Sequence, residues 1–402
     1  MRSLKIVMLA PFGMRPKGTL AARMLPLAQA LVRRGHQVAI FAPPVLNPED
    51  AGRREVLGGV LVAHTPSPRL AGLLGAPEQA AMLLRAALAE GPDVLHLFKP
   101  KGYGGLAALA ARALRPALPL VVDSDDWEGW GGWNDLLPYP LAAKHLFAWQ
   151  ERDLPRRAGA VTVASHTLAR QVLGFGVPAE RVFYLPNGTD DRFLQAAAPG
   201  RVPPSGRGDE ASQRGGLTVL LYTRFWELDV RDVVAALAGI VAREPVARLV
   251  VVGRGERGEE RELLRLARRA GLERAVDYRG WLAPEEIPAV IAAADVALAP
   301  LDDTLINRAR GLAKLLELMA AGVPIVASRV GQAAEYIEDG RSGLLVAPGD
   351  PGALARAALT LLGDPELRAR LSAGARARAA VYRWDALALT AERAYERALE
   401  RS

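Results

Sequence analysis

A helix bounded by two glycines and followed by a buried strand constrains this chain more than any other feature. The apolar run L-A-K-L-L-E-L-M-A-A lies between Gly311 and Gly322, and the segment V-P-I-V-A-S after it is typical of a buried strand. The first turn of such a helix leaves backbone N–H groups without intrahelical partners, and Arg308, Arg310 and Lys314 add positive charge beside them. N–H groups and cations together are what a diphosphate requires.

The same helix carries a carboxylate at a spacing that matters. Glu317 follows Lys314 by three residues, so both side chains are expected on one face of the helix. A carboxylate accepts hydrogen bonds from two hydroxyls, which predicts that Glu317 binds a ribose one turn below the phosphate site. The alternative is an ordinary amphipathic helix with an exposed Lys–Glu pair, which is common on protein surfaces.

Glycine-rich turns surround this helix in a recognisable order. They are L-V-V-V-G-R-G at 249–255, V-D-Y-R-G-W-L-A-P-E-E-I at 276–287, and R-V-G-Q-A-A-E-Y-I-E-D-G-R-S-G-L-L-V-A-P-G-D at 329–350. In this order and spacing they resemble the retaining glycosyltransferases of family 4. The resemblance covers nearly the whole chain and implies an α/β GT-B fold. In that fold two Rossmann-like domains with parallel sheets face each other across an interdomain cleft.

Length and pattern agree with two domains. A chain of 402 residues exceeds one typical domain, and short apolar strands alternate with helical segments, which predicts parallel sheets covered on both faces. We assign residues 1–195 to an N-terminal Rossmann-like domain on the acceptor side and 217–382 to a C-terminal one on the nucleotide-sugar donor side. Residues 196–216, rich in Gly, Pro, Ser and charge, are expected to form a flexible linker. By resemblance, a final helix at 383–402 crosses back to the first domain.

Composition excludes several classes of function. The chain has no cysteine, so disulfides, thiolate metal sites and a cysteine nucleophile are excluded. The first apolar run, L-K-I-V-M-L-A, is too short for a signal peptide, and no segment has the length of a membrane span, so we expect a cytoplasmic protein. Nucleic acid binding is not expected, because no basic stripe alternates with aromatic residues.

The basic excess lies in the first part of the chain. Residues 1–190 contain 21 Lys and Arg against 15 Asp and Glu, leaving 30 against 29 in the rest. An anionic acceptor, or peripheral contact with the inner face of a membrane, would fit this charge. Only six of the 51 basic residues are lysine, so a compositional bias of the genome or a thermal adaptation explains the excess equally well.

The resemblance assigns a donor site residue by residue. Arg224 follows a strand where similar enzymes place an arginine that grips the donor diphosphate, so we predict a catalytic as well as a binding role for it. Those enzymes add a lysine a few positions later, for which Arg231 is the candidate substitute here. Base recognition is expected at Tyr278 and Trp281, although Trp281 is as readily explained as interdomain core. The further predicted donor-binding residues are Gly18, Arg308, Gly311, Leu312, Lys314 and Glu317.

One departure concerns the sugar. The family's first glutamate, eight positions before the second, corresponds to Ala309, while Glu317 supplies the second. The contact with the transferred sugar is therefore expected to differ in this chain. In the following turn, Gly331, Gln332 and Glu335 are expected near the donor sugar or the acceptor, with local capping or pairing as the alternative for Glu335.

The first domain contains an unusual tryptophan-rich segment, V-V-D-S-D-D-W-E-G-W-G-G-W-N-D. Glycines between aromatic residues favour a loop that presents flat faces to a sugar ring or a lipid interface, and a loop packed on itself is the alternative. Similar enzymes carry a histidine near this point, where this chain has carboxylates that could orient hydroxyls or act as a base. His96, in the strand D-V-L-H-L-F, is equally consistent with a structural histidine. The candidate residues for the donor sugar or acceptor are thus Asp126, Trp127, Trp130, Trp133 and His96, with Asp125 as a candidate base.

The expected chemistry follows from these groups. We identify no His, Asp or Glu cluster with metal-ligand spacing and predict neither a metal nor a cofactor, so cationic side chains and helix N–H groups must stabilise the leaving diphosphate. The leading hypothesis is a nucleotide-sugar-dependent glycosyltransferase, of hexosyltransferase type, that uses UDP or GDP sugars and a carbohydrate, lipid or small-molecule acceptor. A non-catalytic GT-B protein that binds nucleotide or glycan, or another GT-B enzyme such as an epimerase or a phosphorylase, remains an alternative.

Overall fold

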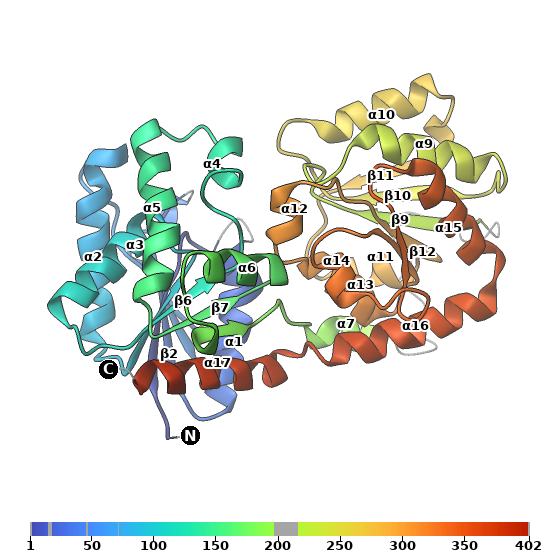
Figure 1. Ribbon diagram of the computed structural model, residues 1–402. Helices are drawn as coiled ribbons and strands as arrows, with labels where there is room; N and C mark the ends of the chain where they lie inside the picture. Colours follow the sequence, from blue (N-terminus) through green and yellow to red (C-terminus); the bar gives the residue numbers. More distant parts are fainter. Residues whose placement is uncertain (1, 15–17, 46, 71, 197–215, 401–402) are drawn as a thin grey trace. The chain divides into compact units, whose positions relative to one another are not determined.

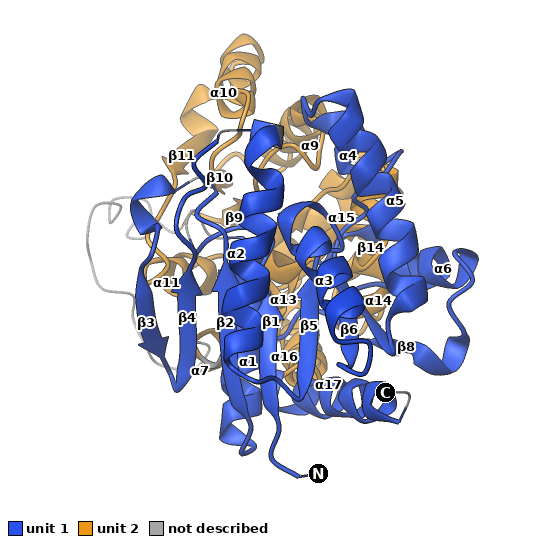
Figure 2. Cartoon of the chain, turned by 90° about the vertical axis from the view of Figure 1, so that its left-hand side faces the viewer, with its two compact units in different colours: residues 1–188, 309–311, 384–402 blue, residues 189–308, 312–383 orange. Residues whose placement is uncertain are grey.

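Two compact units make up the chain. The computed structural model describes residues 2–14, 18–45, 47–70, 72–196 and 216–400, so all but the ends of the predicted linker 196–216 lies outside the described residues. Unit 1 comprises Met1–Gly188, Ala309–Gly311 and Trp384–Ser402, and unit 2 comprises Thr189–Arg308 and Leu312–Arg383 (Figure 2). No helix in the described part of the chain is both long and apolar enough to cross a membrane.

The boundary between the units differs from the predicted one. Unit 2 begins at Thr189, before the short helix α7 (Asp191–Ala196), whereas we expected the first domain to run to residue 195. The reason is packing, because the ring of Phe193 is buried in a hydrophobic core of unit 2. The last helix, α17 (Trp384–Leu399), packs within unit 1 through its buried face.

Unit 1 is built on an eight-stranded sheet. Its strand order is β3-β4-β2-β1-β5-β6-β7-β8, and Figure 2 shows most of these strands side by side. All neighbours pair in parallel except β3 and β4, an antiparallel hairpin at the edge that the sequence analysis missed. The strands are β1 (Lys5–Leu9), β2 (Gln37–Ala42), β3 (Arg54–Leu57), β4 (Val60–His64), β5 (Val94–Phe98), β6 (Leu120–Ser124), β7 (Ala160–Val163) and β8 (Val182–Tyr184).

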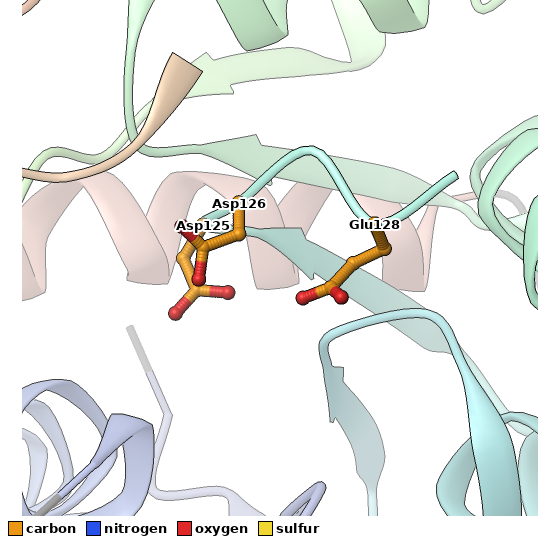
Figure 3. Close-up of side chains that lie close together, drawn as sticks. All are labelled: Asp125, Asp126 and Glu128. Carbon is orange, nitrogen blue, oxygen red and sulfur yellow. The ribbon is translucent and has the colours of Figure 1, made fainter. Parts of the chain in front are cut away.

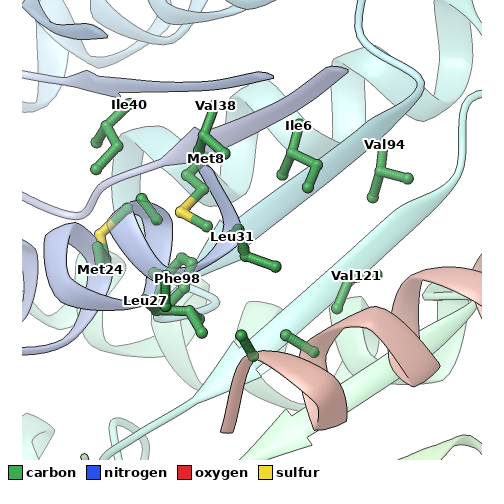
Figure 4. Close-up of a cluster of buried hydrophobic side chains, with 14 of the residues drawn as sticks. Ile6, Met8, Met24, Leu27, Leu31, Val38, Ile40, Val94, Phe98 and Val121 are labelled. Carbon is green, nitrogen blue, oxygen red and sulfur yellow. The ribbon is translucent and has the colours of Figure 1, made fainter. Parts of the chain in front are cut away.

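Alternating side chains of this sheet enter two separate cores. Ile6 and Met8 of β1 face a core shared with α1 and α17, whereas Val7 and Leu9 face the opposite core, as the period of two in a strand requires (Figure 4). Both faces are thus covered, which explains why apolar residues predominate on both faces of the central strands, with His96 and Asp123 as buried polar exceptions. The helices are α1 (Leu25–Arg33), α2 (Ala76–Ala89), α3 (Gly102–Leu114), α4 (Trp133–Leu136), α5 (Leu141–Arg157) and α6 (His166–Gly174).

Unit 2 repeats this design with six parallel strands. The order is β11-β10-β9-β12-β13-β14, and helices cover both faces (Figure 1). One core joins the sheet to α7, α11, α13 and α16, and the other joins it to α9, α10 and α15. The strands are β9 (Thr218–Tyr222), β10 (Arg248–Val252), β11 (Val276–Gly280), β12 (Val296–Ala299), β13 (Ile325–Ser328) and β14 (Leu344–Val346). The helices are α9 (Val230–Val241), α10 (Glu259–Arg269), α11 (Ile287–Ala292), α12 (Leu305–Ala309), α13 (Ala313–Ala321), α14 (Ala333–Tyr336), α15 (Pro351–Gly363) and α16 (Pro365–Ala380).

A buried ion pair ties the carboxyl end of the first sheet together. Arg23 lies in a π-helical turn, Leu20–Met24, and its guanidinium donates to both carboxylate oxygens of Asp123 at 2.8 and 2.7 Å. It also donates to the carbonyl of Leu185 and the side chain of Asn187, while the Thr162 hydroxyl donates to Asp123. Arg23 is 2% exposed and Asp123 is fully buried, so each charge depends on the other for compensation.

We expect Arg23→Met to destabilise the protein by about 3–5 kcal/mol, because it leaves the Asp123 carboxylate buried without its countercharge. A matched control is Arg33→Met, which removes an Arg–Asp pair whose side chains are 57% and 51% exposed. That change should cost less than about 1 kcal/mol. Urea unfolding of both variants measures the change in the free energy of unfolding. Equal decreases in the two variants would show that the buried pair contributes no more to stability than the exposed pair.

Candidate active site

Three side chains of unit 2 converge at the start of α13. Lys314 lies over the ring of Tyr222, with its Nζ 4.3 Å from the ring centroid, and Tyr222 is the last residue of β9. Glu317, one turn along the helix, acts on the same tyrosine, because burial first and the Glu317 carboxylate second raise the pKa of Tyr222. A cation and a carboxylate therefore share one face at the carboxyl end of the sheet. Tyr222 was not identified from the sequence, although its place at a strand end could have signalled it.

The helix itself begins at Ala313, one residue later than the glycine pattern predicts. Its N-cap is Leu312, whose backbone N–H donates to the Gln332 side chain at 2.6 Å, and Gly322 ends it with φ 73°. Gln332 is fully buried, so capping rather than sugar contact is the role that its geometry favours. Gly331 has φ 48°, and an added Cβ would lie 2.6 Å from the Arg308 Cα, which explains why glycine occupies this turn.

A tight turn after β9 presents Arg224 to solvent. Phe225 has φ 70°, a conformation that residues with a side chain rarely adopt and that is often found at functional sites. Glu227, which is 5% exposed, accepts hydrogen bonds from the Thr223 hydroxyl and the Arg224 backbone N–H, both at 3.0 Å. The Arg224 guanidinium is 46% exposed and reaches Glu256 only at 3.5 Å. It is therefore available to a ligand. The sequence analysis missed Glu227, whose position three residues after Arg224 is its only signal.

Two other predicted arginines are engaged locally. Arg308 donates to both oxygens of Asp303, at 2.5 and 2.7 Å, and Arg231 pairs in the same way with Asp229. Arg308 also belongs to the preceding helix α12 rather than to the start of α13. The arrangement of these two side chains favours local ion pairs over the phosphate contacts that we predicted for them.

Three other candidates of unit 2 are at least partly exposed. Trp281 is 60% exposed, so it does not lie in the core of unit 2. Tyr278 lies in β11, where burial raises the pKa of its phenol. Glu335 lies in α14 and its carbonyl accepts from Arg378 at 3.1 Å.

The segment 309–311 groups with unit 1. Ala309 is fully buried in a hydrophobic core of that unit, and its carbonyl accepts from the Ser165 hydroxyl at 2.5 Å. An added Cβ at Gly311 would lie 2.5 Å from Asn187 Nδ2. The side chain at position 309, where the family's first glutamate is missing, therefore points into apolar packing.

In unit 1, three carboxylates gather after β6. Oxygens of Asp125, Asp126 and Glu128 lie within 4.8 Å of one another, which corrects our conclusion from the sequence that no such cluster exists (Figure 3). A lysine supplies their positive partner, since Lys99 Nζ lies 3.1 Å from Asp125 and 2.8 Å from Glu128 and also contacts Asp126. Lys101 pairs with Glu128 as well. Because three carboxylates face only these two ammonium groups, the group of five side chains carries a net negative charge when all are ionised.

The strain and pKa values of this network mark it as more than a surface ion pair. Lys99 is 3% exposed and has φ 55°, and it directly follows β5. Burial alone would lower the pKa of Lys99, but the three carboxylates outweigh burial and raise it well above its usual range. Burial raises the pKa of Asp126 despite Lys99, whereas Lys101 and Lys99 outweigh burial and lower the pKa of Glu128 to about 2. Asp126 is thus the more basic carboxylate.

The start of the first helix approaches the same carboxylates. Thr19, at the N-terminus of this helix, makes no capping hydrogen bond, and its hydroxyl donates to Asp125 at 3.1 Å. Gly18, directly before it, accepts from the Ala22 backbone N–H at 2.9 Å. The backbone beside Gly18 therefore lies next to the carboxylate cluster within unit 1.

The tryptophan-rich loop packs partly on itself. The Trp127 indole N–H donates to the Trp130 carbonyl at 2.9 Å, and a Cβ at Gly132 would clash with the Trp127 carbonyl oxygen. Trp130 nevertheless remains 44% exposed, and Trp133 begins the short helix α4. The loop thus packs partly on itself and leaves Trp130 exposed, while contact of its tryptophans with a sugar or a lipid stays a prediction.

His96 is placed where it cannot meet a ligand directly. Its side chain is fully buried, its Nδ1 lies 3.0 Å from the Tyr395 hydroxyl of α17, and burial lowers its pKa to about 3. This burial favours the structural alternative over the site role that we considered for His96.

Comparisons with known proteins match both units. The family described as Glycosyl transferase 4-like domain matches residues 18–188, and the family described as Glycosyl transferases group 1 matches residues 216–364. A D-inositol 3-phosphate glycosyltransferase of Acidothermus cellulolyticus is 33% identical over 58% of this chain and 52% of its own length. A phosphatidyl-myo-inositol mannosyltransferase of Mycolicibacterium smegmatis is 28% identical over 98% of this chain and 94% of its own length.

A third relative, a GDP-mannose-dependent alpha-(1-6)-phosphatidylinositol monomannoside mannosyltransferase of Mycobacterium tuberculosis, is 34% identical over 59% of this chain. The alignment covers 62% of the length of that relative. This chain therefore spans between about half and three fifths of the length of the Acidothermus and Mycobacterium tuberculosis proteins.

Solved structures share the whole fold. A sucrose-phosphate synthase from Thermosynechococcus elongatus aligns over 100% of both chains with a TM-score of 0.75 and 22% identity. The Anabaena protein HepE in complex with UDP covers 97% of this chain and 98% of its own, with a TM-score of 0.69 and 23% identity. At such identities the likeness shows the fold, and it confirms the predicted GT-B architecture of two Rossmann-like domains. With both units matched by the two family descriptions, the chain belongs to the group 1 glycosyltransferases of the GT-B fold.

Proposed function

We propose that this protein transfers a sugar from a nucleoside diphosphate sugar to an acceptor, with retention of anomeric configuration and without a metal ion. The observation that carries the proposal is the convergence of Lys314 and Glu317 on Tyr222 at the carboxyl end of the second sheet. In open α/β sheets, ligands bind at this end of the strands. Family membership and the relative named as GDP-mannose-dependent support the donor class.

The donor diphosphate is assigned to Arg224 and Lys314. A partly exposed guanidinium forms two parallel hydrogen bonds to phosphate oxygens, and an ammonium group beside a helix N-terminus adds a point charge. As the sugar leaves, negative charge grows on the diphosphate, and these fixed cations stabilise it without reorganisation. Glu317 binds the ribose hydroxyls in the ground state and the transition state alike. Resemblance supports retention, and no covalent enzyme nucleophile is invoked.

The acceptor is assigned to unit 1. Asp126 combines a raised pKa with partial exposure, and a hydroxyl of the acceptor can donate to such a carboxylate. Asp125 is positioned by Lys99 and the Thr19 hydroxyl and contributes negative charge beside it. The acceptor class is a polyhydroxylated ring, in a carbohydrate, a lipid or a small molecule, because relatives are named for inositol phosphate and phosphatidylinositol, whose cyclitol ring bears several hydroxyls.

Nucleotide binding is expected to persist without divalent cations. Lys99 and Lys101 already neutralise most of the carboxylate cluster of unit 1, and the donor residues of unit 2 are cationic rather than metal-ligating. Calorimetric titration of UDP and GDP, with and without EDTA, is the measurement. Binding that disappears completely in EDTA would contradict the proposal.

Glu317→Ala should weaken nucleotide affinity by about 10- to 150-fold, the equivalent of ~1.5–3 kcal/mol for hydrogen bonds to a charged group. The maximal rate should change less, because ribose binding is equal in both states. Glu262→Ala, which removes an exposed carboxylate of α10, is the matched control and should leave affinity unchanged. If the Glu317 variant binds UDP and GDP normally, the helix is structural and has no ribose site.

Arg224→Ala should lower kcat by about 100-fold or more, as for other preorganised donors to developing charge, with a smaller loss of nucleotide binding. The exposed Arg243 after α9 supplies the control, since Arg243→Ala removes the same charge away from the strand end. Steady-state kinetics of both variants, with circular dichroism to verify folding, decide the matter. An unchanged kcat in the Arg224 variant would remove this residue from the mechanism.

A further inference from the structure

An aromatic pocket lies against α5 in unit 1. Its volume is about 380 Å³, within the range of small-ligand sites. Three indoles contribute to its wall, from Trp127 and Trp130 of the loop after β6 and from Trp149 of α5. The complete lining is Trp127, Trp130, His145, Ala148, Trp149, Glu151, Arg152 and Phe175.

The pocket is formed before any ligand arrives. His145, Trp149 and Arg152 occupy positions i, i+4 and i+7 of one helix, so they share a face. The His145 ring packs edge-on against Trp130, with centroids 5.4 Å apart. The hydrogen bond from the Trp127 indole to the Trp130 carbonyl fixes the opposite wall.

Glu151 anchors the loop that forms part of the pocket. Its two carboxylate oxygens accept the backbone N–H groups of Glu128 at 2.7 Å and Gly129 at 3.0 Å, and the residue is only 5% exposed. A Cβ at Gly129 would clash with the Glu151 carboxylate, so the glycine permits this approach. The carboxylate is therefore occupied by the backbone, and the other ionisable side chains that line the pocket are His145 and Arg152.

The charge of the pocket selects among possible occupants. Arg152 is exposed and, among the described residues, has no carboxylate within salt-bridge distance. A quaternary ammonium or other cation would be repelled by it. The faces of indole rings are electron-rich and attract the weakly positive C–H groups of a sugar ring, while a guanidinium binds carboxylate or phosphate in a fork. Because the three tryptophans line one cavity of about 380 Å³, a discrete ring fits better than a bilayer surface.

We propose that this pocket binds a sugar ring carrying a carboxylate or phosphate, stacked between Trp130 and Trp149 with its anionic group on Arg152. The inference rests on the proposed function in that the ring is a part of the acceptor. It deepens that function, since it assigns the acceptor to the class of anionic saccharides. Through the Glu151 contacts with residues 128 and 129, an occupied pocket also steadies the loop that bears the Glu128 carboxylate.

The test measures sugar binding by the full chain with no donor present, so it succeeds or fails separately from nucleotide binding and transfer. Calorimetry and saturation-transfer NMR with glucuronate, glucose 6-phosphate and neutral glucose are the readouts. We expect saturable binding of at least one charged sugar, about tenfold or more tighter than that of glucose. Trp149→Ala and Arg152→Met should each weaken it by about tenfold or more.

Matched controls come from the same helix. Leu141→Ala removes an apolar side chain that is 66% exposed, and Arg156→Met removes an exposed arginine, both outside the pocket. Neither should change sugar binding, and thermal unfolding should show that all four variants are folded.

Three results would overturn the proposal. They are no binding of either charged sugar, equal binding of glucose, or binding that survives both pocket variants. Sedimentation with phosphatidylglycerol vesicles separates the remaining possibility. If Trp149→Ala abolishes vesicle binding while no charged sugar binds, the tryptophans contact a membrane instead. In each of these cases UDP and GDP titrations still report independently on the donor site.

Discussion

One buried guanidinium organises the part of unit 1 from which the acceptor chemistry is proposed. The Nε and Nη2 groups of Arg23 donate to the two carboxylate oxygens of Asp123, 100 residues away in the chain. The same guanidinium also donates to the Leu185 carbonyl and the Asn187 side chain. Asp123 lies at the end of the strand that leads directly into the carboxylate cluster. Because an uncompensated buried charge costs several kcal/mol, this pair fixes where the strand ends and where the next residues emerge. The π-helical turn that contains Arg23 is the local distortion that accompanies this placement.

The two sheets share an unusual backbone conformation near their carboxyl ends. In each sheet, a residue other than glycine has a positive φ just beyond a central strand. Lys99 directly follows β5 in unit 1, and Phe225 follows the end of β9 in unit 2. Such conformations persist only where surrounding contacts determine them. Around Lys99 those contacts are carboxylates, and around Phe225 they are the hydrogen bonds of Thr223 and Glu227. In both units the strain accompanies a charged side chain held at a strand end, which is where α/β proteins bind ligands.

Electrostatic arrangement, more than residue identity, separates the candidate site from its surroundings. Arg224 and Arg308 are both partly exposed arginines near strand or helix ends, yet Arg308 is neutralised by a close bidentate pair and Arg224 is held only by a 3.5 Å contact. The carboxylates of unit 1 differ in degree, because Glu128 contacts both Lys99 and Lys101 whereas Asp126 contacts Lys99. Glu128, flanked by two lysines, stays ionised, whereas burial makes Asp126 more basic. A group that is already paired has little left to offer a substrate.

The sequence by itself determined the alternation of strands and helices, the central parallel strands and the family, because hydrophobic period and glycine spacing are local properties. It also determined the shared face of Lys314 and Glu317, since i, i+3 spacing fixes that geometry. It did not determine the edge hairpin of β3 and β4, because β3 has only four residues, none of them fully buried, and carries two charged side chains. Only the tertiary structure decided which charges are paired, because Lys99 lies 27 residues from Asp126 and no local pattern joins them. The tertiary structure likewise decided that the Ala309 side chain lies in a hydrophobic core. Which side chains remain free to meet a ligand depends on partners brought together by the fold, and sequence spacing carries no information about them.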